Sequence, residues 1–323
     1  MNELPHPPRP SWIRPSMADT PTPPAPSKAL VFARRSGSTL FLWALVTGIF
    51  VSGWSWAFLA LIGGLAMIAT VEYFHLLRAA SVKCFPRFGI LLAAAYSGCL
   101  YWHFWQGGKS IPQDFDAIAI CIAIIGPFAL QLRFPIHGIE SLLTVAANLL
   151  GFVYIALLFN FTARVTFLVP SASEVPGLVG TSGAYLLLWL LAVTKFTDMG
   201  AYITGSMIGR HKMIPHVSPG KTWEGFGGAL LFSQLAACGL YALFPVQLGF
   251  FKEWGHVVFL GFALAVLAVI GDLAESVVKR ALHAKDSGNM LPGIGGSLDL
   301  IDSICFTAPF LYFYLKWILL PAA

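Results

Sequence analysis

Residues 271–303, GDLAESVVKRALHAKDSGNMLPGIGGSLDLIDS, concentrate charge between two long apolar runs. They hold five of the chain's 15 acidic residues and three of its 20 Lys and Arg residues, although only 11% of the chain is charged. Ionisable side chains near a bilayer interior are costly unless they meet a partner, water or a metal ion. We therefore predict that this stretch forms a metal and phosphate site at a membrane surface.

The composition of the whole chain is that of a membrane protein. Its 323 residues are 57% hydrophobic with a mean hydropathy of +0.74, whereas a soluble domain carries about 25% charged residues. The net charge of +5 does not indicate nucleic-acid binding, because the basic residues are scattered between apolar runs. Loops beside anionic lipid account for them. The predicted fold class is all-α, a polytopic integral membrane protein.

Apolar runs of about the 17–25 residues that cross a bilayer recur after residues 1–36, a proline-rich tail that we expect to be disordered. We place nine of them at 37–52, 54–74, 88–106, 115–132, 141–162, 181–207, 226–246, 255–273 and 302–320. The helices of 37–175 are predicted to bury little charge. The region 176–323 carries the motifs with chemistry.

The distribution of Lys and Arg predicts the orientation. With the N-terminus in the cytoplasm, twelve basic residues fall on the inner side, and four fall outside: Lys109, Arg164, Lys252 and Lys316. This asymmetry places residues 271–303 and the 208–225 loop on the same, cytoplasmic, face of an inner membrane.

The first group of candidate residues lies in 195–225. Asp198 and Tyr202 are one helical turn apart, and the loop SPGKT at 218–222 then supplies Ser218, Lys221 and Thr222. This loop is not a Walker A motif, because GxxxxGK[ST] is absent. A Gly-Lys-Thr turn with free N–H groups is nevertheless suited to phosphate. A loop that is basic only for topology would explain Arg210 and Lys212, but not this turn.

The second group lies in the opening stretch. Asp272, Ser276 and Lys279 are spaced to share one helix face, with Arg280 beside them. The glycine-rich residues 288–296 are expected to form a reentrant loop that binds an anion, and Asp299 and Asp302 follow on one face of the last run. Clustered carboxylates repel one another unless a cation binds, and hard oxygen ligands favour Mg²⁺ over zinc. The alternative is a structural ion-pair network with Lys279, Arg280 and Lys285.

Glu72 and His75 are three residues apart near the end of the second run, so they share a helix face. Two interpretations stay open: an interfacial charge beside Arg78, or a role near the active site. The five cysteines form no CxxC pair, and neither a zinc site nor a disulfide framework is expected.

These motifs resemble the phosphatidate cytidylyltransferases, the CDP-diacylglycerol synthases. The first match is DxGAYxxG at 198–205, followed by Gly209-Arg210 and SPGKTWEG at 218–225. The second comprises SVVKR at 276–280, KDS at 285–287, LPG at 291–293, GG at 295–296, LD at 298–299 and DS at 302–303. The chain departs from the family pattern at Ile294, where a His is common, and at Leu300, where an Arg is common. Each change removes a contact to phosphate or headgroup and keeps the carboxylates.

The resemblance implies the reaction CTP + phosphatidate → CDP-diacylglycerol + pyrophosphate, with Mg²⁺ as cofactor and the number of cations open. The expected catalytic residues are Asp272, Lys279, Arg280, Asp299 and Asp302, of which Asp272, Asp299 and Asp302 are assigned to the metal. The expected substrate-binding residues are Asp198, Ser218, Lys221, Thr222, Ser276 and Lys285. The resemblance alone suggests a homodimer. Two other functions stay open: a lipid kinase or nucleotidyltransferase acting on a different lipid, and an ion-coupled transporter.

Overall fold

The computed structural model describes residues 54–108, 111, 112, 114–136, 138–168, 182–284, 286–288 and 295–320, with single positions at 44, 46, 48 and 49. The proline-rich tail, most of the first predicted run, and two residues named above, Lys285 and Ile294, lie outside this part. So does most of the glycine-rich stretch expected to form a reentrant loop.

Helices follow the apolar runs of the sequence closely. The chain order is α2 (Ser55–Ala79), α3 (Pro86–Trp105), α4 (Phe115–Gln131), α5 (Ile139–Gly151), the π-helix η2 (Phe152–Leu157), α6 (Phe161–Leu168), α7 (Ser182–Ile208), α8 (Trp223–Leu243), the 3₁₀-helix η3 (Gly249–Phe251), α9 (Trp254–Ala281), α10 (Ser297–Tyr314) and the π-helix η4 (Leu315–Leu319). Pro86 opens α3, where its missing N–H costs no hydrogen bond.

Six helical segments of the described chain are long and apolar enough to cross a membrane: 56–79, 139–168, 183–208, 223–243, 254–281 and 297–319. The segment 139–168 joins α5, η2 and α6, and α4 is a shorter apolar helix. The prediction of a multi-pass all-α membrane protein is therefore confirmed. The number nine stays a prediction.

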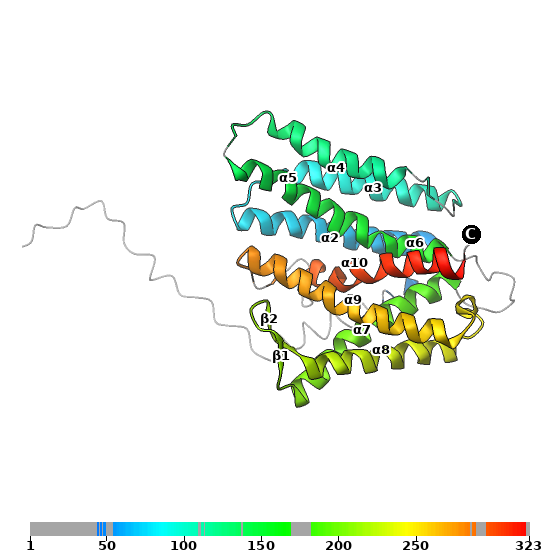
Figure 1. The fold of residues 1–323 in the computed structure, drawn as a ribbon. Coiled ribbons are helices and arrows are strands. Elements are labelled where there is room, and N and C mark those ends of the chain that lie inside the picture. Colours follow the sequence, from blue (N-terminus) through cyan, green and yellow to red (C-terminus); the bar gives the residue numbers. More distant parts are fainter. Residues whose placement is uncertain are drawn as a thin grey trace, which may run out of the picture.

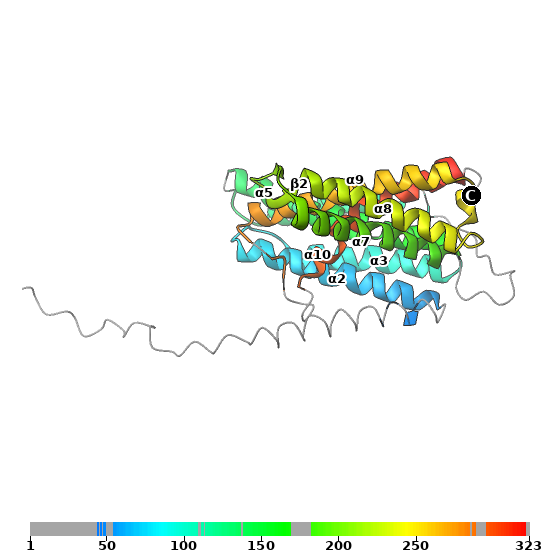
Figure 2. The same cartoon turned by 90° about the horizontal axis from the view of Figure 1, so that it is seen from below.

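The helices form three tiers that share one hydrophobic core. In Figure 1, α3, α4 and α5 make the upper tier, α2, α6 and α10 the middle, and α7, α8 and α9 the lower. From below, α7 runs along α8 and α9 (Figure 2), and α10 contacts α9 on one side and α2 and α6 on the other. Residues of all three tiers belong to the core, so the N-terminal and C-terminal helices are packed as one body.

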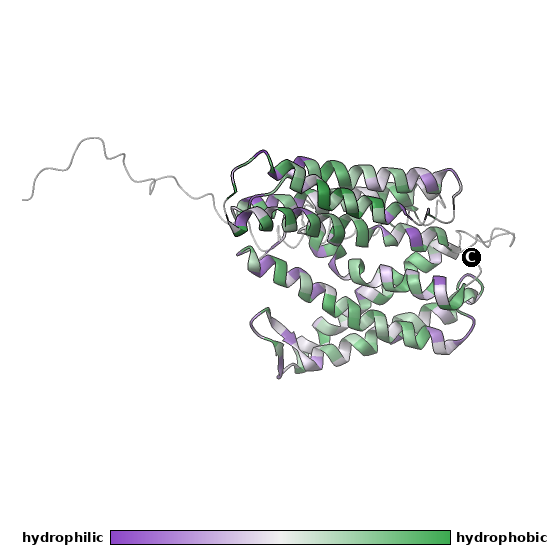
Figure 3. Cartoon of the chain, turned by 45° about the horizontal axis from the view of Figure 1, so that its top comes forward, coloured by the Kyte–Doolittle hydropathy of each residue, from purple (hydrophilic) through white to green (hydrophobic). Residues whose placement is uncertain are grey.

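Hydrophobic residues also cover the outside of the bundle. Figure 3 shows apolar residues along the helices, with hydrophilic residues gathered mainly toward the two ends. On α4, Ile118, Ile125 and Phe128 are all at least half exposed. An outer surface this apolar is suited to lipid rather than to water.

The loop expected at 208–225 contains a β-hairpin. Strand β1 (Lys212–Ile214) pairs antiparallel with β2 (Ser218–Thr222) at the end of the bundle away from the C-terminus (Figure 1). The prediction of a phosphate-binding turn at SPGKT was therefore wrong in its local structure. The segment is extended, and ladder hydrogen bonds use part of its backbone donors.

The expectation that the helices before residue 175 bury little charge was also wrong. Glu72 is 2% exposed and Arg164 is 4% exposed. Arg164 lies in α6 rather than in an outer loop, and its guanidinium donates to both carboxylate oxygens of Asp116, at 2.7 and 2.5 Å, and to the hydroxyl of Tyr96. A paired, hydrogen-bonded guanidinium is the form in which a buried charge is tolerated.

Glycine sets the distance between α7 and α8. A Cβ atom at Gly228 would lie 1.9 Å from Oγ1 and 2.4 Å from Cγ2 of Thr204, and one at Gly200 would lie 2.5 Å from the carbonyl oxygen of Gly228. Side chains of any size at these positions would push the helices apart. Small residues at such crossings are the usual means of close packing in membranes.

We expect Gly228→Ala to destabilise the protein by about 1–3 kcal/mol, the usual cost of overpacking. The neighbouring Gly227→Ala is the matched control, because a Cβ there meets nothing within 4 Å. Thermal unfolding of the two variants in detergent measures the difference. Equal midpoints would mean that the close approach of α7 and α8 does not limit stability.

Candidate active site

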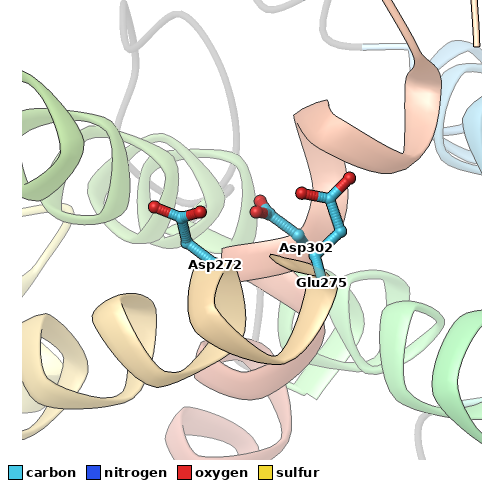
Figure 4. Close-up of side chains that lie close together, drawn as sticks. All are labelled: Asp272, Glu275 and Asp302. Carbon is cyan, nitrogen blue, oxygen red and sulfur yellow. The ribbon is translucent and has the colours of Figure 1, made fainter. Parts of the chain in front are cut away.

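Three carboxylates meet between α9 and α10. One oxygen each of Asp272, Glu275 and Asp302 lies within 4.8 Å of the others. Figure 4 shows Asp272 and Glu275 on neighbouring turns of α9, with Asp302 reaching from α10 between them. Glu275 is 1% exposed and Asp302 is 4% exposed, so their charges are held away from bulk water.

A glycine brings the two helices close enough for this meeting. A Cβ at Gly271 would lie 2.8 Å from the carbonyl oxygen of Asp302 and 2.9 Å from Cα of Ser303. Both of these atoms belong to the backbone of α10, so they could not make room for a side chain by a change of rotamer. The glycine directly before Asp272 therefore permits α10 to present Asp302 to α9.

Lys279 joins the third predicted metal ligand to this group. Its ammonium lies 2.7 Å from Oε2 of Glu275 and 2.8 Å from Oδ1 of Asp299. The other oxygen of Asp299 accepts the N–H of Gly296, which caps α10. The structure thus places Asp272 and Asp302 next to Glu275, which the sequence analysis did not name, and holds Asp299 against Lys279.

A cavity of about 380 Å³ adjoins the carboxylates. Its walls come from α7, the hairpin, the start of α8 and α9, and its lining residues include Asp198, Tyr202, Ser218, Lys221, Thr222 and Asp272. The predicted pairing of Asp198 with Tyr202 on one face of α7 is confirmed, because both line this cavity. Both groups of candidate residues therefore meet in space.

Lys221 carries the connection between the hairpin and α9. Its ammonium lies 2.8 Å from Oδ2 of Asp272 and donates to the carbonyl oxygen of Val269 at 3.2 Å. Asp272 is thus shared: it lines the cavity and it belongs to the group of three carboxylates.

These groups lie well inside the bundle. Asp272 is nine residues from the end of α9 at Ala281, which is about 14 Å at 1.5 Å per residue. The 28 residues of α9 span about 42 Å, which matches the full thickness of a bilayer with its headgroups. Asp272 therefore lies about one third of the way in from the C-terminal end of a helix that is long enough to cross a bilayer.

The charges of this region do not cancel. Among the described residues it contains five carboxylates, of Asp198, Asp272, Glu275, Asp299 and Asp302, and three ammonium groups, of Lys195, Lys221 and Lys279. Full ionisation leaves two negative charges in excess. A bound cation would offset them, since like charges in a low dielectric strongly oppose one another.

The donor set fits a hard divalent cation. All three oxygens are carboxylate oxygens, the ligand type preferred by Mg²⁺. Opposite ligands of Mg²⁺ are about 4.2 Å apart, so the 4.8 Å spread of these atoms is within a small side-chain adjustment. One buried oxygen, Oε1 of Glu275, has no hydrogen-bond partner within the described part of the protein.

The hairpin is attached to α8 by Glu224. Its carboxylate accepts the backbone N–H groups of Arg210 and His211 and lies 2.5 Å from Nδ1 of His211. Thr222 caps α8 by accepting the N–H of Gly225 at 3.1 Å. The Thr222 hydroxyl, which we expected to bind phosphate, thus accepts a backbone hydrogen bond through its oxygen. Its proton could still be donated to a phosphate.

Two of the remaining predicted residues, Arg280 and Ser276, are on α9, and Lys285 is outside the described chain. Arg280 is exposed and donates to the carbonyl oxygen of Ala284 at 3.4 Å. Ser276 is partly buried on α9. Sequence reasoning missed Glu275 and Glu224 as site residues, although a signal existed for the first: an acid one turn after Asp272 in an apolar helix.

The fold and the site define a class of protein: a multi-pass helical membrane protein in which a group of carboxylates adjoins a cavity that contains Lys221. Comparison with known proteins narrows this class. A model of the cytidylyltransferase family matches residues 33–318. The chain belongs to this family, and it is a nucleotidyltransferase.

Relatives cover most of the chain. An uncharacterized protein of Escherichia coli K12, YnbB, is 30% identical over 251 residues, which cover 77% of this chain and 79% of that protein. A Bacillus subtilis 168 protein named phosphatidate cytidylyltransferase is 29% identical over 253 residues, 77% of this chain and 86% of the relative. A Haemophilus influenzae protein of the same name is 40% identical over 134 residues, 41% of this chain and 46% of the relative.

We expect Glu224→Ala to release the hairpin from α8, because two backbone N–H groups lose their acceptor. Hydrogen–deuterium exchange of a peptide covering residues 209–216 should become severalfold faster. Glu253→Ala is the control, since Glu253 is an exposed acid with no side-chain cap hydrogen bond. Unchanged exchange in the Glu224 variant would show that the strand ladder alone holds the hairpin.

Proposed function

We propose that this protein transfers the cytidylyl group of CTP to phosphatidate, forming CDP-diacylglycerol and pyrophosphate. Membership of the cytidylyltransferase family supports the reaction type. Two relatives named phosphatidate cytidylyltransferase, at 29% and 40% identity, support the lipid acceptor.

One observation carries the proposal: Asp272 belongs both to the carboxylate group and to the cavity lined by Lys221. Nucleotidyl transfer between two phosphate-bearing substrates needs a site where their negative charges are offset and their reacting atoms are held in line. A group of carboxylates able to hold a cation, next to a cavity that contains Lys221, would meet both requirements.

The chemistry needs no strong general base. A phosphate monoester has a second pKa near 6, so the phosphate of phosphatidate is largely dianionic at neutral pH. One of its oxygens attacks the α-phosphorus of CTP, a new P–O bond forms, and the bond from the α-phosphorus to the bridging oxygen of the β-phosphate breaks. Pyrophosphate leaves with the electron pair of that bond.

Asp272, Glu275 and Asp302 are the residues that would hold Mg²⁺. When bound, Mg²⁺ supplies charge neutralisation for the triphosphate and for the developing pyrophosphate. Asp299 orients Lys279 through their 2.8 Å contact, and Asp198, on the cavity wall, is the candidate acid for a second cation.

The cationic and hydroxyl side chains would bind phosphate. Lys221 and Lys279 are nearest to the carboxylates, and Ser218 and Thr222 line the cavity from the hairpin. Arg280 and Ser276 lie on α9 beside them, and Lys285 follows α9. These last three are assigned to phosphate by the motif that they match.

The orientation that we propose puts the hairpin and the carboxylates toward the cytoplasm of an inner membrane, where CTP is available. The predominance of basic residues at this end supports it. Phosphatidate would enter from the bilayer, with its acyl chains in lipid and its phosphate at the depth of Asp272. A homodimer stays a prediction of the family resemblance.

Purified protein should convert labelled CTP and phosphatidate into CDP-diacylglycerol and pyrophosphate only with Mg²⁺ present. Asp272→Asn and Asp299→Asn should each lower the rate by at least about 100-fold, the usual scale for losing transition-state charge stabilisation. Asp114→Asn, an exposed acid at the start of α4, is the matched control.

The same assay separates the alternatives. A CTP-dependent lipid kinase would release CDP rather than pyrophosphate and would prefer a polyprenol or diacylglycerol acceptor. A transporter would release neither product. Pyrophosphate release that does not depend on phosphatidate would contradict the proposed acceptor.

Single cysteines test the orientation in a background with the five native cysteines replaced. Lys212→Cys on the hairpin and Glu253→Cys before α9 lie at exposed positions at opposite ends of the bundle. In intact cells, a membrane-impermeant maleimide should label the second and not the first. After permeabilisation both should react, and the reverse pattern in intact cells would invert the orientation.

A further inference from the structure

We infer that Glu72 is a positioning residue for the reaction: from α2 it holds the first turn of α10 and so sets where Asp302 meets Asp272 and Glu275. The inference rests on the proposed function for its catalytic consequence. Glu72 lies in α2, outside the motifs of residues 195–305, so the N-terminal helices would also help to arrange the site.

The direct contact is a hydrogen bond across the bundle. Oε2 of Glu72 accepts the backbone N–H of Leu298 at 3.0 Å, and Glu72 is 2% exposed. Leu298 is the second residue of α10, so its N–H is one of the donors that a helix leaves without an internal partner. A carboxylate at this position also interacts favourably with the helix dipole. Glu72 is therefore an N-terminal cap supplied by another helix.

A second contact joins the same two helices. The hydroxyl of Ser297 donates to the carbonyl oxygen of Leu65 on α2 at 3.2 Å. The chain also passes close to Glu72 at Gly288, nine residues before α10 begins, because a Cβ there would lie 2.8 Å from Oε1 of Glu72. The two hydrogen bonds fix the first two residues of α10 against α2.

The geometry of the helix carries this constraint to the carboxylates. Leu298 and Asp302 are four residues apart, and residues with this spacing lie on the same face one turn apart. A shift of the first turn of α10 therefore moves Asp302 relative to Asp272 and Glu275, whose oxygens now lie within 4.8 Å. Asp299, in the same turn, would move relative to Lys279.

The open question about Glu72 and His75 is thereby answered in favour of Glu72 alone. His75 is exposed, whereas Glu72 is buried against α10. An interfacial charge beside Arg78 would be solvated, and a carboxylate at 2% exposure is not.

Four variants of the full-length protein test the inference. Glu72→Ala removes the acceptor, and Glu72→Gln keeps an oxygen that can accept the N–H of Leu298. Ser297→Ala removes the second tie and is the milder change. Tyr73→Phe is the matched control, since Tyr73 is the buried neighbour on α2 and its hydroxyl donates to Ala147, away from α10.

Two readouts are measured in detergent: kcat and KM for CDP-diacylglycerol formation, and Mn²⁺ affinity from the free-Mn²⁺ electron paramagnetic resonance signal. Loss of a residue that orients metal ligands costs 10–100-fold in metal affinity or activity. Glu72→Ala should therefore lower kcat and weaken Mn²⁺ binding about tenfold or more, with a smaller change in KM for CTP. Glu72→Gln should restore most of both, and Tyr73→Phe should lose thermal stability without either effect.

Wild-type values in Glu72→Ala, or equal losses in Glu72→Ala and Glu72→Gln, would overturn the inference. If Glu72→Ala does not fold, Ser297→Ala decides: reduced kcat and weaker Mn²⁺ binding support the role, and wild-type values refute it. A wild-type protein that makes no CDP-diacylglycerol would refute the proposed function instead, while the Mn²⁺ measurements would still test Glu72.

Discussion

The ion pair between Lys221 and Asp272 is the contact on which the arrangement of the site depends. It joins a hairpin at the end of the bundle to a carboxylate about 14 Å inside α9. A carboxylate at that depth is costly without a partner, and Lys221 reaches it only because Glu224 and Thr222 fix the hairpin to α8. The hairpin therefore forms a wall of the cavity, and its Lys221 offsets the negative charge of Asp272.

The N-terminal helices hold the helices of the site in place through two buried charged residues, Glu72 and Arg164. α10 lies between α9, which carries Asp272 and Glu275, and α2 and α6, which bear none of the signature motifs. Glu72 meets the start of α10 from α2, and the Arg164–Asp116 pair holds α6 to α4. Each of these buried charges makes hydrogen bonds to a neighbouring helix, so each fixes one helix relative to another. The position of Asp302 is in this way set from both sides of α10.

Periodicity and charge were enough to predict much of this structure. Each predicted apolar run from residue 54 onward contains a helix, but α9 continues eight residues past the run 255–273. The dense charge of 271–303 located most of the carboxylates. The sequence could not tell that Asp302 lies within 4.8 Å of Asp272 and Glu275 whereas Asp299 contacts Lys279. Both aspartates share a helix face, and the choice depends on the close approach at Gly271. Glu72 was equally hidden, because its partner Leu298 lies 226 residues further along the chain.

One departure from the family pattern, Leu300, bears on how phosphate would be bound. Leu300 is partly buried and packs against the hydrophobic core, so it offers no cation where the family commonly has Arg. Under the proposed function, phosphate binding would rely mainly on Lys221 and Lys279, whose ammonium groups are held by carboxylates in this structure. A triphosphate carries more negative charge than a carboxylate and competes for the same ammonium groups. Under the proposed function, carboxylates that bind a cation release their lysines to phosphate, so cation and CTP would bind cooperatively at Asp272.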